Sequence, residues 1–164
     1  MNDPAEPRVD WRAVPTFGVP PRVGHATVRP SAYAVLIDAG GRVAVVHTPR
    51  GTFLPGGGID PGETPQAAIV REVLEECGLR ASVGQWIAHA VEFVDSEEES
   101  TYFEKHSTFA GARSHGAAVA PLEPDQELAW FAPDVAIARL SPLSHRWAIG
   151  IFVASTQPAG DVGD

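Results

Sequence analysis

Cysteine is almost absent from this sequence, which contains only Cys77. A single cysteine cannot form a disulfide within the chain and cannot build a cysteine-rich zinc site. Long apolar runs are also missing: the longest, at 147–154, is far shorter than the ~20 residues of a membrane-spanning helix. The first residues, MNDPAEPRVDW, lack the basic-then-apolar order of a signal peptide. We therefore expect a cytoplasmic protein that binds no membrane.

Positive charge is scarce as well. The chain has 12 Lys and Arg residues against 21 Asp and Glu residues, a net charge of −9. Sequence-independent binding to DNA or RNA depends on a basic surface, so nucleic acid is not an expected partner. A polyanionic small molecule would need a cation between itself and this protein.

The chain length of 164 residues and the apolar fraction of 44% are typical of one folded domain. Because prolines are frequent near the N-terminus, residues 1–15 are expected to form a flexible arm, and 16–28 at most an edge hairpin. A single domain is predicted over 16–156 and a frayed C-terminus over 157–164.

Several segments have the composition of regular elements. Two β-branched runs, 32–37 and 42–47, flank Asp-Ala-Gly-Gly and predict a hairpin of antiparallel strands. The Gly- and Pro-rich stretch 49–62 predicts an irregular loop. Further strands are predicted at 83–93, 102–110 and 128–131, and further helices at 134–140 and 144–154. This order predicts an α/β layered sandwich with a mixed sheet.

Residues 64–77 predict a helix with Thr64 as N-cap, Pro65 in its first turn and Gly78 after its end. Its packing face is predicted to be centred on Val70 and to comprise Ala67, Val70, Val73, Leu74 and Cys77. Three carboxylates fall on the opposite face, those of Glu72, Glu75 and Glu76. Such oxygen ligands suit Mg²⁺ or Mn²⁺, although a solvated acidic surface gives the same pattern.

The loop before this helix contains Gly56, Gly57 and Gly58, which allow the backbone to approach a ligand closely. Five residues separate Gly57 from Glu63, and seven more separate Glu63 from Arg-Glu-Val-Leu-Glu-Glu-Cys-Gly-Leu at 71–79. This segment resembles the Nudix box, Gly-x5-Glu-x7-Arg-Glu-U-x-Glu-Glu-x-Gly-U with U aliphatic, and every fixed position matches.

The resemblance implies a Nudix α/β/α sandwich with a mixed β-sheet. It also implies a hydrolase that cleaves the diphosphate linkage of a nucleoside diphosphate bonded to another group. By position, Glu75 and Glu76 resemble the principal metal ligands, Glu72 a ligand or general base, and Arg71 the residue that orients them. Glu63 and the backbone of Gly57 are implied to complete the geometry of the loop and the metal site.

Other candidate residues lie downstream of the box. Asp125 and Glu127 precede Trp130, where the family often supplies one further carboxylate, and we expect one of them near the glutamate cluster. His145 and Trp147 are candidates for substrate binding, although a Trp on an apolar helix, as Trp147 is, more often lies in the core. The charged run 97–99 is expected to be a solvated loop.

Two other functions on the same fold remain open. An isoprenoid-diphosphate isomerase is disfavoured, because there is no cysteine outside the box to protonate its substrate. A catalytically retired ligand sensor would have no need of three mutually repelling glutamates. The family's markers for ADP-ribose and dinucleoside polyphosphates, a proline or a tyrosine, are absent from 94–97. The expected partner is therefore a nucleotide, with a nucleoside triphosphate (oxidised ones included) favoured, and a homodimer stays open.

Overall fold

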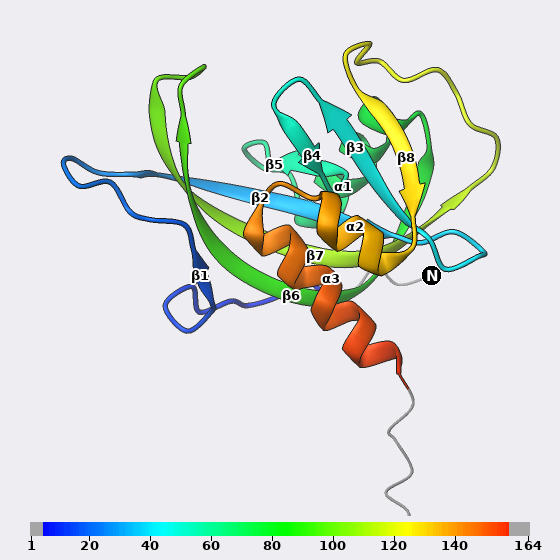
Figure 1. The fold of residues 1–164 in the computed structure, drawn as a ribbon, viewed down its shortest axis with the longest axis horizontal. Coiled ribbons are helices and arrows are strands. Elements are labelled where there is room, and N and C mark those ends of the chain that lie inside the picture. The colour runs from blue at the N-terminus through cyan, green and yellow to red at the C-terminus, as the bar shows by residue number, and fades with distance from the viewer. Residues whose placement is uncertain (1–4, 158–164) are drawn as a thin grey trace, which may run out of the picture.

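The protein folds into two β-sheets covered by helices (Figure 1). The computed structural model describes residues 5–157. The strands are β1 (Thr16–Phe17), β2 (Thr27–Leu36), β3 (Val43–Thr48), β4 (Gly51–Phe53), β5 (Gly56–Gly58), β6 (Arg80–Ser96), β7 (Thr101–His115) and β8 (Glu127–Phe131). The helices are α1 (Pro65–Cys77), α2 (Pro133–Arg139) and α3 (Leu143–Thr156).

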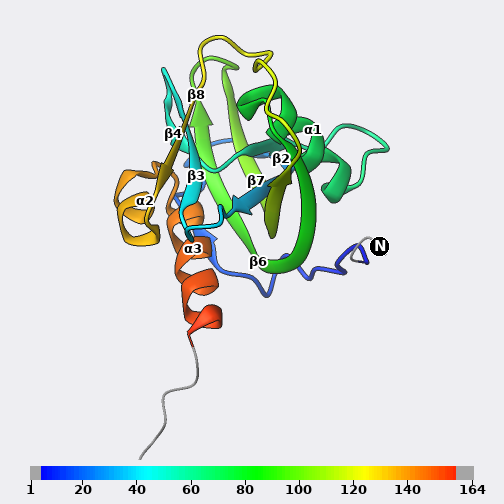
Figure 2. The same ribbon diagram turned by 90° about the vertical axis from the view of Figure 1, so that its right-hand side faces the viewer.

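The larger sheet has the order β1-β6-β7-β2-β5 and the smaller one the order β4-β3-β8. Strands β6 and β7 form a long antiparallel ladder, while β2 runs parallel to β7 and β5 runs antiparallel to β2. Figure 2 shows α1 on one side of the sheets and α2 and α3 on the other. The predicted α/β/α sandwich with a mixed sheet is therefore confirmed.

Each helical layer covers its own apolar core. Below α1, Ile69 and Val73 pack in a cluster that contains Ala34 and Leu36 of β2. The cluster below α2 and α3 contains Val35 of β2. Because successive residues of a strand point to opposite faces, β2 contributes to both cores, which explains its continuous apolar run.

The predicted hairpin over 32–37 and 42–47 is wrong in its pairing. Both strands exist, but β2 belongs to the larger sheet and β3 to the smaller one, and only the bridge Ile37↔Val43 joins them. Each strand pairs with other strands along both of its edges. Strand β2 lies between β7 and β5, and β3 lies between β4 and β8. The edges are therefore not available for a hairpin ladder.

Two other local predictions differ from the structure. The stretch 49–62, predicted to be irregular, contains the short strands β4 and β5. Strand β4 pairs with β3, and the three glycines of β5 pair with β2 over Ser31–Tyr33. No edge hairpin forms over 16–28; β1 instead pairs in parallel with β6. The strands and helices predicted after residue 80 are confirmed in place, and most extend further than expected.

The described part of the N-terminal arm, residues 5–15, lies against the larger sheet. The indole of Trp11 stacks on His106 with ring centroids 4.7 Å apart. Trp86 Nε1 donates to the carbonyl of Ala5 at 3.0 Å, and Val91 N donates to that of Pro15 at 2.9 Å. This segment therefore has no regular structure but is attached to β6 and β7, which differs from the expected flexible arm.

Most of the C-terminal segment expected to fray, residues 158–164, lies outside the described part of the chain. The limits given for the domain stay a prediction. Between residues 5 and 157, none of the helices has the length and apolar character needed to cross a membrane.

Candidate active site

Helix α1 begins and ends as its sequence predicts. Thr64 Oγ1 accepts a hydrogen bond from Ala67 N at 3.2 Å, and Pro65 occupies the first turn. Gly78 ends the helix in the left-handed region with φ of 65°. These local signals are sufficient to predict both ends of the helix, because they satisfy backbone groups that a helix leaves unpaired at its ends.

The predicted packing face of α1 is wrong in its centre. Val70 is 41% exposed, whereas Ile69, Val73 and Cys77 are buried, and so is Glu76 at 7% exposure. The helix contacts three strands of the larger sheet, β2, β5 and β6. An acidic residue therefore lies in the buried part of the helix surface, which a helical wheel based on hydrophobicity assigns to solvent.

Arg71 connects the helix to the preceding loop. Its Nε and Nη2 donate to the two carboxylate oxygens of Glu63 at 2.8 and 2.9 Å, and Nη1 contacts Glu72 at 2.8 Å and Glu75 at 3.4 Å. Nη2 also donates to the carbonyl of Gly58 at 3.1 Å. The hydrogen bonds to Glu63 and Glu72 raise the pKa of Arg71, and the bond from Arg71 lowers the pKa of Glu63. Arg71 thus stays charged and fixes Glu72 and Glu75.

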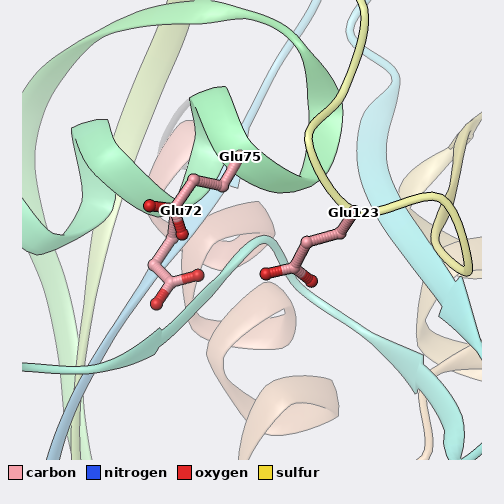
Figure 3. A group of neighbouring side chains, drawn as sticks. All are labelled: Glu72, Glu75 and Glu123. Carbon is pink, nitrogen blue, oxygen red and sulfur yellow. The ribbon is translucent and has the colours of Figure 1, made fainter.

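Three carboxylates converge beside this arginine. Ligand oxygens of Glu72, Glu75 and Glu123 all lie within 4.8 Å of one another. In Figure 3, Glu72 and Glu75 come from α1, and Glu123 reaches toward them from the loop that precedes β8. Like charges at this distance repel, so a shared cation would stabilise the arrangement.

Glu123 was not among the residues that the sequence suggested. Its loop is held on the C-terminal turn of α1, where Val119 N donates to Gly78 O at 2.8 Å and Leu122 N to Glu75 O at 2.9 Å. These bonds use carbonyls that a helix end leaves without partners. The only sequence signal was an acidic residue in a loop before Trp130, and that signal suggested Asp125 or Glu127, with Asp125 slightly favoured.

Asp125 and Glu127 are both exposed and do not belong to this group of three. Asp125 borders a shallow pocket that Glu123 also lines, and Glu127 pairs with His47 across the β3–β8 ladder. The structure thus places a different carboxylate at the position expected for one of them.

Glu76 lies behind the cluster. Burial raises the pKa of Glu76 to about 9, assisted by the hydrogen bond and the charge of Glu72 and by the charge of Glu123. The N–H of Gly56 acts in the opposite direction by donating to the Glu76 carboxylate. Within residues 5–157 no basic side chain forms an ion pair with Glu76 or Glu123.

A cleft of about 640 Å³ opens beside Glu76. Its lining combines the triglycine strand β5, Glu76 and Gln126 with aromatic residues and with the cations Arg29, Arg50 and Lys105. The run 97–99 is exposed and lies at the rim, as the sequence indicates for a solvated turn. A Cβ atom at Gly56 would lie 2.2 Å from the carbonyl oxygen of Ala32, so only glycine permits this contact between β5 and β2.

His145 and Trp147 do not line this cleft. His145 is 3% exposed, lies between aromatic rings, and accepts a hydrogen bond from Leu54 N on Nδ1 at 3.1 Å. Burial and the charge of Lys105 lower the pKa of His145 to about 3, so its ring is neutral. Trp147 packs against Phe17 on the core side of α3. His145 is thus buried in the core and the half-buried Trp147 packs against it, so neither is proposed for substrate binding.

The comparisons with known proteins agree with this geometry. The family model described as NUDIX domain matches residues 27–150. The chain belongs to the Nudix family. A relative from Mycolicibacterium smegmatis named 8-oxo-(d)GTP phosphatase is 29% identical over 113 residues, which are 68% of this chain and 33% of that protein. A second curated relative, from Bacillus subtilis, is 32% identical over 80 residues, 49% of either chain.

Solved structures show the same fold. The Nudix hydrolase from Nitrosomonas europaea has a TM-score of 0.64 at 20% identity and covers 84% of this chain and 97% of its own. An ADP-ribose pyrophosphatase from Streptococcus suis has a TM-score of 0.56 at 19% identity, with 81% and 96% covered. At these identities the likeness establishes the fold of this Nudix chain and not its substrate.

Proposed function

We propose that this Nudix chain is a metal-dependent pyrophosphohydrolase that cleaves the diphosphate linkage of a nucleoside di- or triphosphate derivative. The observation that carries the proposal is the convergence of Glu72, Glu75 and Glu123 next to Glu76, which borders a cleft whose lining includes the cations Arg29, Arg50 and Lys105. Carboxylates alone would repel a polyanion, and cations alone could not activate water. Their combination supports diphosphate hydrolysis.

The residues present fit a divalent metal ion. The donors are all carboxylate oxygens, the ligands that Mg²⁺ and Mn²⁺ prefer. The loop residue Glu123 forms no ion pair with the basic residues of the described chain, so a cation would supply its missing counter-charge. Beside the buried Glu76, a cation would favour the ionised carboxylate over the neutral acid that burial favours. We assign Glu72, Glu75 and Glu123 as ligands, with Glu76 and the backbone of Gly57 completing the site.

A bound Mg²⁺ or Mn²⁺ would offset the charge of the diphosphate and lower the pKa of a nearby water. The protein contributes position and proton transfer. Arg71 holds Glu72 and Glu75 in place through its ion pairs and keeps the loop carbonyl of Gly58 turned toward itself. One oxygen of Glu72 binds Arg71, and we assign the other as the acceptor of the proton from the attacking water.

The preferred substrate is a nucleoside triphosphate, oxidised ones included. The Mycolicibacterium relative is named for such a substrate, and the sequence lacks the markers for ADP-ribose and dinucleoside polyphosphates. Burial raises the pKa of Cys77 to about 12, so the one thiol of the chain is unsuited to the protonation step of an isomerase. A homodimer and a cytoplasmic location stay predictions.

The test is a nucleotide panel with Mg²⁺ or Mn²⁺, with products identified by mass. We expect activity that excess EDTA abolishes and that either metal restores. Glu123→Gln should lower turnover at least about 10-fold, since it removes one ligand charge, while Asp134→Asn on the exposed first turn of α2 should leave it unchanged. Full activity in EDTA would contradict the metal mechanism. A larger loss in Asp125→Asn than in Glu123→Gln would show that the wrong carboxylate is assigned.

A further inference from the structure

Two cations lie side by side on the floor of the cleft. Arg29 of β2 and Lys105 of β7 are register partners in neighbouring parallel strands, and both line the cleft. Register partners on adjacent strands are about 5 Å apart and point to the same face of the sheet. Like charges in this position repel each other, so the pair is stabilised when an anion binds between them.

Lys105 has no partner within the described residues. Its neighbour on the other side is Glu92 of β6, but the Glu92 carboxylate accepts from Leu143 N and Ser144 N at 3.1 Å and from the Ser144 hydroxyl. Glu92 therefore caps the N-terminus of α3. Over residues 5–157 the ammonium of Lys105 forms neither a hydrogen bond nor an ion pair.

Arg29 connects this floor to the triglycine strand. A Cβ atom at Gly58 would lie 3.2 Å from Arg29 Nε, and one at Gly57 would lie 2.9 Å from Glu72 Oε1. The two faces of β5 thus touch the arginine on one side and the carboxylate cluster on the other. The guanidinium of Arg29 and the carboxylate of Glu72 therefore lie against adjacent residues of the same short strand.

An acidic turn competes for the same arginine. Glu99, in the turn between β6 and β7, contacts Arg29 Nη1 at 3.0 Å, with the two side chains 39% and 46% exposed. Its neighbour Glu98 contacts Arg50 across the mouth at 2.7 Å. Such solvent-exposed ion pairs contribute little stability, so a phosphate can displace them at small cost.

We propose that Arg29 and Lys105 form an anion site that binds the substrate phosphates not held at the carboxylate cluster, and that Glu99 is the counter-ion displaced from Arg29. This site favours a chain of three phosphates over a diphosphate, because two cations are available beyond the metal site. The inference rests on the proposed function, since the cluster is taken to hold the phosphate that is attacked.

The test uses inorganic tripolyphosphate and calorimetry on the full chain in EDTA, so that neither metal nor hydrolysis is required. We expect Arg29→Gln and Lys105→Gln each to weaken binding about 10-fold or more, as expected for loss of a charged hydrogen bond. Lys105→Arg should restore most of the affinity. Glu99→Gln should strengthen binding about 2- to 5-fold. Arg42→Gln is the control: it removes the same charge from an arginine that pairs with Asp38 outside the cleft. This variant should change the affinity for tripolyphosphate less than about 2-fold.

A second measurement uses the fact that Lys105 is the only lysine of the sequence. Tripolyphosphate should slow acetylation of Lys105 by acetic anhydride at least about 5-fold in peptide mass spectrometry, in proportion to the fraction bound. An unchanged rate at saturation, or equal affinity of Lys105→Gln and the unaltered protein, would overturn the proposal.

The outcomes for this site and for the enzyme are separable. If the variants lose tripolyphosphate but no nucleotide is hydrolysed, the anion site stands and the proposed function fails. If a triphosphate is hydrolysed and Arg29→Gln and Lys105→Gln keep the original KM, the function stands and the anion site fails.

Discussion

Gly78 lies where the loop that carries Glu123 contacts the C-terminal end of α1, and Gly78→Ala tests this contact. The residue has φ of 65°, and a Cβ atom there would lie 2.0 Å from Val119 O and 3.2 Å from Pro121 N. Both contacts are with backbone of the loop that carries Glu123, so the loop has to move. Gly116, at the start of the same loop, has φ of 69° and nothing within 4 Å of such a Cβ atom. Gly116→Ala is therefore a matched control.

The magnitudes follow from these two geometries. A non-glycine residue in the left-handed region costs about 1–2 kcal/mol, which both variants incur. Forcing a methyl group into occupied space adds about 1–3 kcal/mol in Gly78→Ala alone. For a chain of this size, each kcal/mol lowers Tm by roughly 2–4 °C. We therefore expect Gly78→Ala to melt roughly 2–12 °C below Gly116→Ala.

The assay is thermal unfolding in EDTA, monitored by circular dichroism. Each folded variant is also titrated with Mn²⁺. Gly78→Ala should also bind Mn²⁺ more weakly than Gly116→Ala, since displacement of the loop moves Glu123 away from Glu72 and Glu75. Equal melting temperatures of the two variants would refute the contact between the loop and the helix end as the structure describes it.

Three further predictions follow from single residues. Glu76→Gln should lower turnover at least about 10²-fold in a metal-loaded nucleotide assay and leave the EDTA melting temperature nearly unchanged, because without metal the buried Glu76 carboxyl, with a pKa of about 9, is neutral like the amide that replaces it; unchanged turnover would contradict it. His145 has a folded pKa of about 3 and titrates near 6.5 when unfolded, so stability is complete above pH 6.5 and falls by up to about 1.4 kcal/mol per unit as the pH drops toward 3. Urea unfolding between pH 7 and 4.5 should show a smaller slope for His145→Gln, and identical slopes would argue against a buried neutral ring. Gly56→Ala should lower the unfolding free energy by at least about 2 kcal/mol, because its Cβ atom would meet the β2 backbone, with Gly41→Ala, whose Cβ atom has open space, as the control.

The features that sequence predicts here are those set by neighbours along the chain. Thr64, Pro65 and Gly78 determine the ends of α1 within a few residues of themselves, and the box places Glu72, Glu75 and Arg71 on that helix. Local hydrogen bonds and helical spacing are sufficient for such features. Both the helix and its charged residues could therefore be derived without the fold.

The features that sequence misses depend on contacts between distant segments. Glu123 joins the cluster because its loop donates hydrogen bonds to Gly78 O and Glu75 O, a choice that no local pattern encodes. The 32–37 and 42–47 strands were paired incorrectly because their true partners, β7 and β8, lie far along the chain. His145 was a candidate for substrate binding, but the hydrogen bond from Leu54 N and the surrounding rings make it a buried acceptor.

The parallel pairing of β2 with β7 also determines when the active site can form during folding. Thr27 pairs with Phe103, so the chain has to close a long loop containing all of α1 before β2 can join the sheet. The β6–β7 ladder is local and needs no such closure. Strand β5 pairs with β2 alone, and it carries the glycines that lie against Glu72. On a ribosome, the segment with α1 is therefore synthesised well before it has a sheet on which to fold, and the carboxylate group is completed only after β7 and the following loop with Glu123 have emerged.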